Sequence, residues 1–279
     1  MWILEPFQLR LEDEESPLLL LHSWCERDGV TAGFTTRQAH NTALHVGDDP
    51  NAVIQSRIQV TEELGWKFEA FTCAEQVHSN EVHVVTSEDY GRGRLHRDNA
   101  IQSMDALITN ESDVLLAMYF ADCVPLYFYD PVTESLGLAH AGWKGTVTEI
   151  AVKTVEKLQA VYGAKPENVL AAIGPSIGSC CYEVDQNVLQ HVLPLLGKLR
   201  NGNSSHEDAR IVKPAQSEGR AYLDLKHLNR ELMIKAGILP SHIEMSSWCT
   251  SCRTDLFFSH RKENGVTGRM MSWLGRKSR

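Results

Sequence analysis

Three residues of this chain have the side chains and settings that catalytic chemistry requires. Cys123 lies in the segment 121–125 (ADCVP) and His140 in the segment 139–145 (AHAGWKG), at the ends of two neighbouring apolar runs. His78 lies further upstream. One thiolate and two imidazoles can hold a transition metal that keeps an open position. A thiol beside an imidazole can equally be a nucleophile with its base, so both interpretations place chemistry here.

Structural roles compete with these chemical ones. A lone cysteine is most often a buried core thiol, and a lone histidine at a strand end is more often structural than catalytic. Asp122 argues against a simple core position for Cys123, because an aspartate rarely enters a core without partners. Small residues around His140 allow a ligand to approach closely, and Gly145 is predicted to begin a helix whose first amides favour an anion. Together these settings favour a functional site.

Other metal-binding patterns are weaker. Cys249 and Cys252 form a Cys-x-x-Cys, and Cys180 and Cys181 could complete a set of four sulfurs. Adjacent cysteines seldom ligate one tetrahedral ion well, and the chain has no second Cys-x-x-Cys, so we expect no structural zinc there. The His-x-His pairs expected of a blue-copper oxidase and the complete zinc-deaminase pattern are also missing.

The composition is that of an ordinary globular protein. The 279 residues are 43% hydrophobic and 23% charged, enough for one large domain or two small ones with a substantial core. A formal charge of −9 disfavours a nucleic-acid or anionic-membrane surface, and no segment is apolar for long enough to span a membrane. Acidic residues before the leucines at 18–21 argue against a signal peptide, and seven cysteines suit a reduced, cytoplasmic protein.

Apolar runs and helical spacing predict interleaved strands and helices. Strands are expected over 18–24, 82–86, 105–109, 114–120, 126–129, 136–140, 169–173, 243–246 and 269–273. Helices are expected over 50–64, 145–162, 185–196 and 224–236. The polar segment 197–217 predicts a surface loop. We therefore predict one α/β or α+β domain over residues 1–279, with a mixed sheet.

Several motifs occur in the order typical of one known family. They are 76–78 (QVH), 105–109 (DALIT), 121–125 (ADCVP), 140–145 (HAGWKG), 173–178 (IGPSIG) with 181–184 (CYEV), and 256–261 (LFFSHR). Over about residues 33 to 274, the chain resembles the YlmD/YfiH proteins, the bacterial relatives of the human laccase-domain protein. That family was once described as polyphenol oxidases and is now regarded as purine nucleoside phosphorylases.

The resemblance implies a single-domain, layered α–β–β–α sandwich with mixed sheets. It also implies a metal, usually zinc and alternatively copper, on His78, Cys123 and His140. The implied reaction is phosphorolysis of adenosine, inosine or methylthioadenosine to the free base and ribose 1-phosphate, with adenosine deamination as an additional activity. Four positions match the family's substrate pocket: Asn41, His45, Arg57 and Arg261.

Two positions depart from the family pattern. Lys262 stands where a second arginine is usual, and Ser56 stands where an asparagine is common. Both changes concern substrate contacts and leave the three metal-ligand positions intact.

The lead hypothesis is a cytoplasmic, metal-dependent purine nucleoside phosphorylase, monomeric or homodimeric, acting on a purine nucleoside and phosphate. Cleavage of the N-glycosidic bond requires an electrophile near the base and a held phosphate near the sugar. Zinc on Cys123, His78 and His140 would keep one position open. Arg57 is the candidate for the phosphate or ribose side, because a guanidinium binds phosphate bidentately. Asp122 is expected to orient a metal ligand.

Three alternatives stay open. A Cys–His amidase or deamidase would use Cys123 as nucleophile and His140 as base. Copper-dependent polyphenol oxidation would come from copper bound at the zinc ligands. A non-catalytic metal-binding or partner-binding protein would hold a structural zinc, which normally has four protein ligands, with the fourth from His83 or His45.

Overall fold

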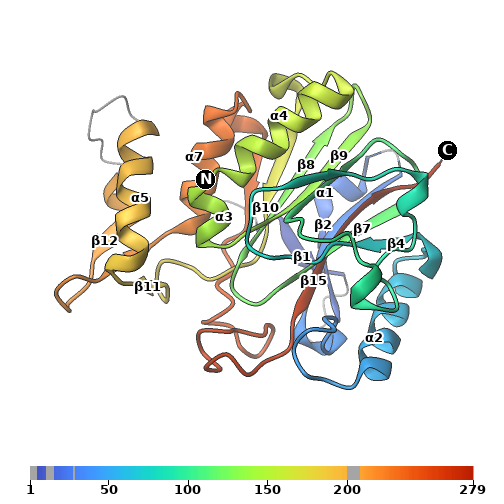
Figure 1. The fold of residues 1–279 in the computed structure, drawn as a ribbon, viewed down its shortest axis with the longest axis horizontal. Coiled ribbons are helices and arrows are strands. Elements are labelled where there is room, and N and C mark those ends of the chain that lie inside the picture. The colour runs from blue at the N-terminus through green and yellow to red at the C-terminus, as the bar shows by residue number, and fades with distance from the viewer. Residues whose placement is uncertain (1–4, 11–15, 28, 200–207, 279) are drawn as a thin grey trace.

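Two mixed β-sheets lie face to face, with helices on both outer faces (Figure 1). The computed structural model describes residues 5–10, 16–27, 29–199 and 208–278. Within these residues each of the two sheets has six strands, and a small third sheet has three. The predicted α–β–β–α layering with mixed sheets is confirmed.

The first sheet has the strand order β1-β2-β3-β15-β7-β4. Its strands are β1 (Phe7–Leu9), β2 (Leu18–Leu21), β3 (Val30–Thr35), β15 (Met270–Arg276), β7 (Val114–Phe120) and β4 (Phe71–Cys73). β7 pairs antiparallel with β15 and parallel with β4, which makes the sheet mixed.

The second sheet has the order β14-β10-β8-β9-β6-β5. Its strands are β14 (Ile243–Met245), β10 (Leu170–Ile173), β8 (Val124–Asp130), β9 (Ser135–Ala141), β6 (Ala106–Thr109) and β5 (Val82–Val84). β10 pairs parallel with β14, so the loops that follow these two strands leave the sheet at the same end.

Strand β7 shows how the layers are held together. Its even-numbered residues from Val114 to Phe120 lie in the core between the two sheets, and its odd-numbered residues from Leu115 to Tyr119 lie in the core on the outer face. Successive side chains of a strand point to opposite faces, so a strand buried on both faces must be apolar throughout. The unbroken run of apolar residues at 114–120 follows from this position.

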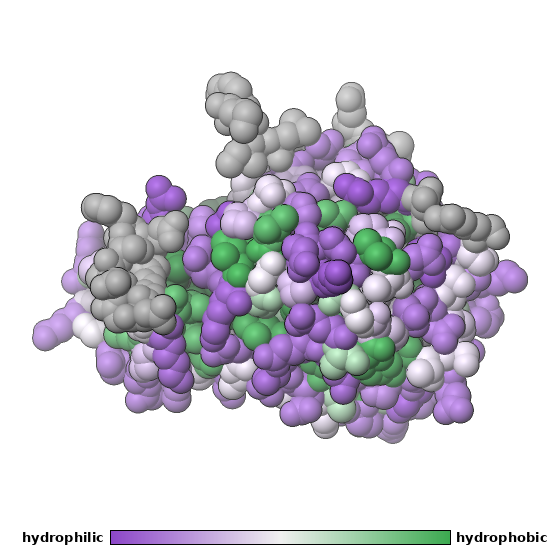
Figure 2. All heavy atoms as spheres, turned by 90° about the horizontal axis from the view of Figure 1, so that it is seen from above, coloured by the Kyte–Doolittle hydropathy of each residue, from purple (hydrophilic) through white to green (hydrophobic). Residues whose placement is uncertain are grey.

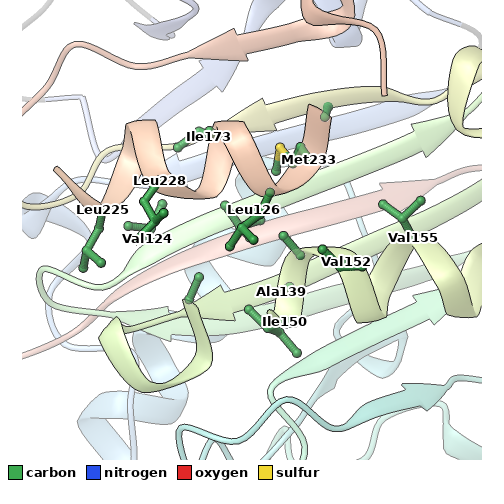
Figure 3. Packing of buried hydrophobic residues seen from close by; sticks show 14 of the residues in the cluster. Val124, Leu126, Ala139, Ile150, Val152, Val155, Ile173, Leu225, Leu228 and Met233 are labelled. Carbon is green, nitrogen blue, oxygen red and sulfur yellow. The ribbon is translucent and has the colours of Figure 1, made fainter. Parts of the chain in front are cut away.

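Helices cover the outer faces of the two sheets. On the first sheet, α2 (Pro50–Glu63) contributes Val60 to the outer core. On the second sheet lie α4 (Ile150–Tyr162) and α7 (Leu225–Lys235). Figure 3 shows Ile150 of α4 and Leu228 of α7 packed over the strands of this sheet.

The small third sheet and α5 form a lateral extension, seen on the left of Figure 1. The sheet order is β11 (Glu183–Val184), β13 (Ala221–Leu223) and β12 (Val212–Pro214), and α5 spans Gln186–Leu199. The predicted loop over 197–217 is therefore wrong at its ends, where α5, the short helix α6 (Asp208–Ile211) and β12 lie. Its centre, 200–207, lies outside the described residues.

Most predicted strands and helices are confirmed, with differences at their ends. The predicted strand 18–24 becomes the short helix α1 (His22–Cys25) after β2. The predicted helix 145–162 consists of α3 (Trp143–Val147) and α4, because Glu149 has a left-handed backbone with φ 63°. α3 begins before Gly145 and has Gly142 as its N-cap.

The surface seen in Figure 2 has small hydrophobic patches separated by hydrophilic residues. No helix within the described ranges combines the length and the apolar character needed to cross a bilayer.

We predict that the Asp224 cap of α7 stabilises the fold in a pH-dependent way. Its carboxylate accepts the His227 amide at 3.0 Å and lies 3.0 Å from the His227 imidazole. Burial alone would raise the pKa of Asp224, but the hydrogen bonds of His227 lower it below its ordinary value of 3.8. Asp224→Ala should therefore lower the free energy of unfolding at neutral pH by about 1–2 kcal/mol.

Asp224→Asn keeps a capping oxygen and isolates the effect of the charge. A carboxyl group with a lowered folded pKa stabilises the fold above its unfolded pKa, and this stabilisation is lost as pH falls through the folded pKa. Urea unfolding of the wild type and Asp224→Asn should differ at pH 7 and converge as Asp224 is protonated. A gap that stays constant down to the acid limit would contradict the assigned pKa direction.

Candidate metal centre

A buried carboxylate, that of Asp105, organises the site. Its Oδ1 accepts the His78 amide at 3.0 Å and lies 2.8 Å from Nδ1 of His140. Its Oδ2 accepts the amides of Val77 at 3.1 Å and Ser79 at 2.7 Å, and the Ser79 hydroxyl at 2.9 Å. A carboxylate without solvent access requires such donors. These contacts fix the loop 77–79 against β9.

The turn that carries Cys123 joins the two sheets. β7 of the first sheet ends at Phe120 and β8 of the second begins at Val124, so the chain crosses between the sheets over three residues. Asp122 has φ 82° in this turn. Its Oδ1 accepts the Thr250 hydroxyl at 2.7 Å, and its Oδ2 accepts the Arg261 amide at 2.7 Å. These contacts between the carboxylate and the loop 250–261 offset the backbone strain of the turn.

His78, Cys123 and His140 converge at one end of the layer between the sheets. One ligand atom from each lies within 4.8 Å of the others, and Nε2 of His78 lies 3.9 Å from Sγ of Cys123. Because Nδ1 of His140 faces Asp105, its Nε2 is the nitrogen left for a ligand. The His78 and His140 rings are nearly perpendicular, with centroids 4.8 Å apart.

The charges of these groups favour a thiolate at Cys123 beside a protonated His140. Burial alone would lower the pKa of His140, but the charge of Cys123 and the hydrogen bond to Asp105 raise it to about 9. Burial alone would raise the pKa of Cys123, but the nearby His140 imidazole lowers it below its ordinary value. At Asp105, the hydrogen bond and charge of His140, together with the hydrogen bonds from Ser79, outweigh burial and lower the pKa to about 2. A thiolate, which is the form that binds metals, is therefore accessible near neutral pH. The Asp105 carboxylate orients the His140 ring in the way that carboxylates orient many metal-binding histidines.

We call His78, Cys123 and His140 the three-residue group. It forms part of the wall of a cavity of about 460 Å³. Tyr182, Arg261 and Arg269 line the same cavity. A second cavity of about 50 Å³ is lined by Arg57 and Arg97 and shares three lining residues with the larger one: His45, Gln76 and Tyr119. The larger volume is in the range of roughly 300–1,000 Å³ that is usual for small-molecule sites.

Arg57 does not line the larger cavity. Its Nε donates to the Thr42 carbonyl at 2.7 Å and its Nη1 to the Gly93 carbonyl at 2.8 Å. Its guanidinium also lies 4.7 Å from the centre of the Tyr119 ring. Arg57 is thus a rigid, buried cation beside the junction of the two cavities, and its phosphate-binding role stays a prediction.

The other predicted substrate residues lie in different settings. His45 and Arg261 line the larger cavity. Asn41 lines neither cavity, because its side chain accepts the amides of Ala43 and Arg269 and donates to Asp48. It positions the backbone of Arg269, which does line the larger cavity.

The carboxylate that contacts a histidine ligand candidate is that of Asp105, for which the sequence predicted no such role. Asp122 orients the loop 250–261, whereas Asp105 contacts His140. Asp105 was visible only as an acidic residue directly before a buried strand, which is a weak signal. Arg269 and Tyr182 were also missed as cavity residues, since nothing in their local sequence distinguishes them.

Neither proposed fourth ligand joins the three-residue group. Within the described ranges, the group contains no part of His45 or His83, and Nε2 of His83 instead lies 3.0 Å from Asp89.

The remaining cysteines differ from expectation: one sulfur each from Cys180, Cys181, Cys249 and Cys252 lies within 4.8 Å of the others. The argument that adjacent cysteines would not share a site is therefore wrong in its geometry.

Comparison with known proteins places this chain in one family. A family model described as multi-copper polyphenol oxidoreductase laccase matches residues 23–277. The match therefore assigns the chain to the class of laccase-domain proteins. The chain belongs to the YlmD/YfiH family of such proteins.

Individual relatives agree with this assignment. Purine nucleoside phosphorylase YlmD of Geobacillus stearothermophilus is 40% identical over 258 residues, covering 89% of this chain and 91% of that protein. The protein of the same name from Bacillus subtilis is 37% identical over 274 residues, covering 93% and 94%. The crystal structure of Bacillus licheniformis hypothetical protein YfiH has a TM-score of 0.88 at 40% identity and covers 98% of this chain and 99% of its own.

We predict that Gly142→Ala disrupts this site without unfolding the protein. The φ of Gly142, −68°, is ordinary for any residue, but an added Cβ would lie 2.9 Å from the His78 ring and 3.0 Å from Sγ of Cys123. Zinc affinity, measured by competition with a chromogenic chelator, should fall at least about tenfold. Gly197→Ala is the control, since nothing lies within 4 Å of its Cβ position. Equal affinity in the two variants would contradict the proposed ligand geometry.

Proposed function

We propose that this protein is a metal-dependent purine nucleoside phosphorylase and that residues 1–279 act as one catalytic domain. The observation that carries the proposal is the position of the three-residue group, which opens into a cavity that also holds cationic side chains. The similarity to purine nucleoside phosphorylases YlmD supports it.

The donor set fits a zinc ion. A thiolate and two imidazoles are ligands that zinc accepts, and the carboxylate behind His140 fixes which nitrogen faces the centre. Three protein ligands are typical of a catalytic site that keeps one position open. When bound, the ion would supply an electrophile for the substrate atom at that position.

Cations gather around His45, which lines both cavities. Burial lowers the pKa of His45 to about 4, and the charges of Arg269, Arg97 and Arg57 lower it further. His45 is therefore a neutral imidazole at pH 7, surrounded by guanidinium groups. Such a setting favours a phosphate anion, so we place phosphate at the junction of the two cavities.

The chain's own residues then account for the other requirements of phosphorolysis. Positive charge develops on the ribose as the glycosidic bond breaks, and a phosphate held at the arginines would both stabilise that charge and attack the sugar. The departing base becomes negative and requires donors, for which Lys144 and His260 are available in the cavity wall. Tyr182, beneath the guanidinium of Arg261 at 5.1 Å, offers an aromatic surface to the nucleoside.

A Cys–His thiol enzyme is the second candidate, because one observation favours it. The sequence of contacts Asp105–His140–Cys123 is the arrangement of a nucleophile, its base and an orienting carboxylate. A second imidazole, that of His78, lies 3.9 Å from the thiol and favours metal binding instead. Alkylation distinguishes the two, since a metal ligand is protected from iodoacetamide by zinc and a free nucleophile is not.

We predict phosphate-dependent release of adenine from adenosine by the zinc-loaded protein. Cys123→Ser should lower this rate at least about 100-fold through loss of a metal ligand, while Cys25→Ser, at an exposed thiol outside both cysteine-containing groups, should leave it unchanged. Chromatography of the products would measure ribose 1-phosphate, and formation of inosine would report the deamination that the family resemblance implies. Equal adenine release with and without phosphate would overturn the proposal.

We predict that Arg57→Lys raises the KM for phosphate. A lysine keeps the charge but loses the carbonyl contacts that fix the position of the guanidinium, so the KM for phosphate should rise roughly tenfold while the KM for adenosine changes little. Melting temperature provides the control for structural damage, because Arg57 also holds the carbonyls of Thr42 and Gly93. An unchanged KM for phosphate in a folded variant would assign Arg57 a purely structural role.

A further inference from the structure

A second group of sulfurs lies outside the candidate active site. It comprises Cys180, Cys181, Cys249 and Cys252, and we call it the four-cysteine group. Sγ of Cys252 lies 3.5 Å from Sγ of Cys180 and 3.4 Å from Sγ of Cys181. All four sulfurs lie within 4.8 Å of one another. The mechanism proposed above uses none of them.

Two neighbouring loops bring these cysteines together. The parallel strands β10 and β14 end side by side, and their following loops stay in contact through a bridge between Ser176 and Cys249. The Thr250 amide donates to the Ser176 carbonyl at 3.1 Å. About 70 residues of sequence therefore separate cysteines that the sheet places next to each other.

The turn before the adjacent pair explains how both can face one centre. The amides of Cys181 and Tyr182 both donate to the Gly178 carbonyl at 3.0 Å, so the chain curls tightly at 178–182. In this curl, Cys180 and Cys181 both direct sulfur atoms to Cys252. The sequence-based objection to adjacent ligands assumed a more extended backbone.

The surroundings of Cys249 suit sulfur in its thiolate form. The Gly178 amide donates to Sγ of Cys249 at 3.2 Å, and an added Cβ on Gly178 would lie 3.2 Å from Sγ of Cys180. Backbone donors to sulfur stabilise its negative charge. Lys226 is also buried nearby, where its ammonium donates to the carbonyls of Ser246 and Trp248 and interacts with the charge of Cys249. A buried cation is favoured beside an anionic cluster.

We propose that the four-cysteine group binds a second divalent metal ion of the zinc class, which has a structural role. Four thiolates at one point are the ligand set of closed structural zinc sites. A disulfide is a poorer account, because Cys252 lies almost equally far from two partners and neither distance approaches the S–S bond length of roughly 2.05 Å.

The proposed ion would be held by loops that are connected to the cavity wall. Tyr182 follows Cys181 directly and lines the cavity, and Arg261 donates to the Glu183 carbonyl at 2.7 Å. The loop of Cys249 and Cys252 also carries Thr250, which donates to Asp122. The ion would therefore fasten together two loops that contribute Tyr182 and Arg261 to the cavity wall.

Metal analysis of variants tests the proposal without any assay of activity. After anaerobic loading with zinc and desalting, wild type should retain about two equivalents per chain, Cys123→Ser and Cys252→Ser about one each, and the double variant about none. Cys25→Ser is the matched control and should retain about two. A zinc content in Cys252→Ser equal to that of wild type would overturn the proposal.

Cobalt substitution in Cys123→Ser provides a second readout that does not depend on the folding of a Cys252 variant. This variant keeps the four-cysteine group intact, so cobalt should give the strong sulfur-to-metal absorption of a four-thiolate site. Its melting temperature should also fall when the metal is chelated. A missing absorption band would contradict the proposal, as would two fewer free thiols in denatured wild type, which would indicate a disulfide.

Discussion

The contacts of the Asp105 carboxylate are the interaction on which the site depends. It binds three consecutive backbone amides of the loop 77–79 and the imidazole of His140. The loop amides hold His78 in a left-handed conformation with φ 64°, which a histidine rarely adopts without support. One buried charge thereby sets the positions of two of the three metal-ligand candidates. Its cost of burial is offset because each oxygen has donors.

The third ligand candidate depends on the arrangement of the sheets. Cys123 lies where the chain passes from the first sheet to the second, between β7 and β8. His140 on β9 is paired in register with Pro125 of β8, just beyond that crossing. The site therefore lies at the end of the layer between the sheets, where side chains from both sheets can meet and where the tightly packed core gives way to a cavity. The same loops, on their outer side, hold the four-cysteine group.

Local sequence patterns predicted most of the long strands, a mixed sheet in an α/β or α+β domain, and the three ligand candidates, whereas the layered α–β–β–α arrangement was implied by the family resemblance. Strand β7 was predicted at its observed bounds because a strand buried on both faces has an unmistakable apolar run. The three-residue strand β4 was not predicted, since so short a run shows no clear period. Long-range contacts were the main source of error. Whether Asp105 or Asp122 supports a ligand, and whether Cys180 meets Cys252, depends on which loops the sheets place together.

The most direct test of this account is an anomalous diffraction map at the zinc edge, from crystals grown with zinc, phosphate and a non-cleavable adenosine analogue. The account predicts an ion bound by Nε2 of His78, Sγ of Cys123 and Nε2 of His140, with its remaining position facing the analogue and phosphate beside the arginines. An ion with a fourth protein ligand, or an analogue bound away from this cavity, would contradict the claim that the group is an open catalytic centre.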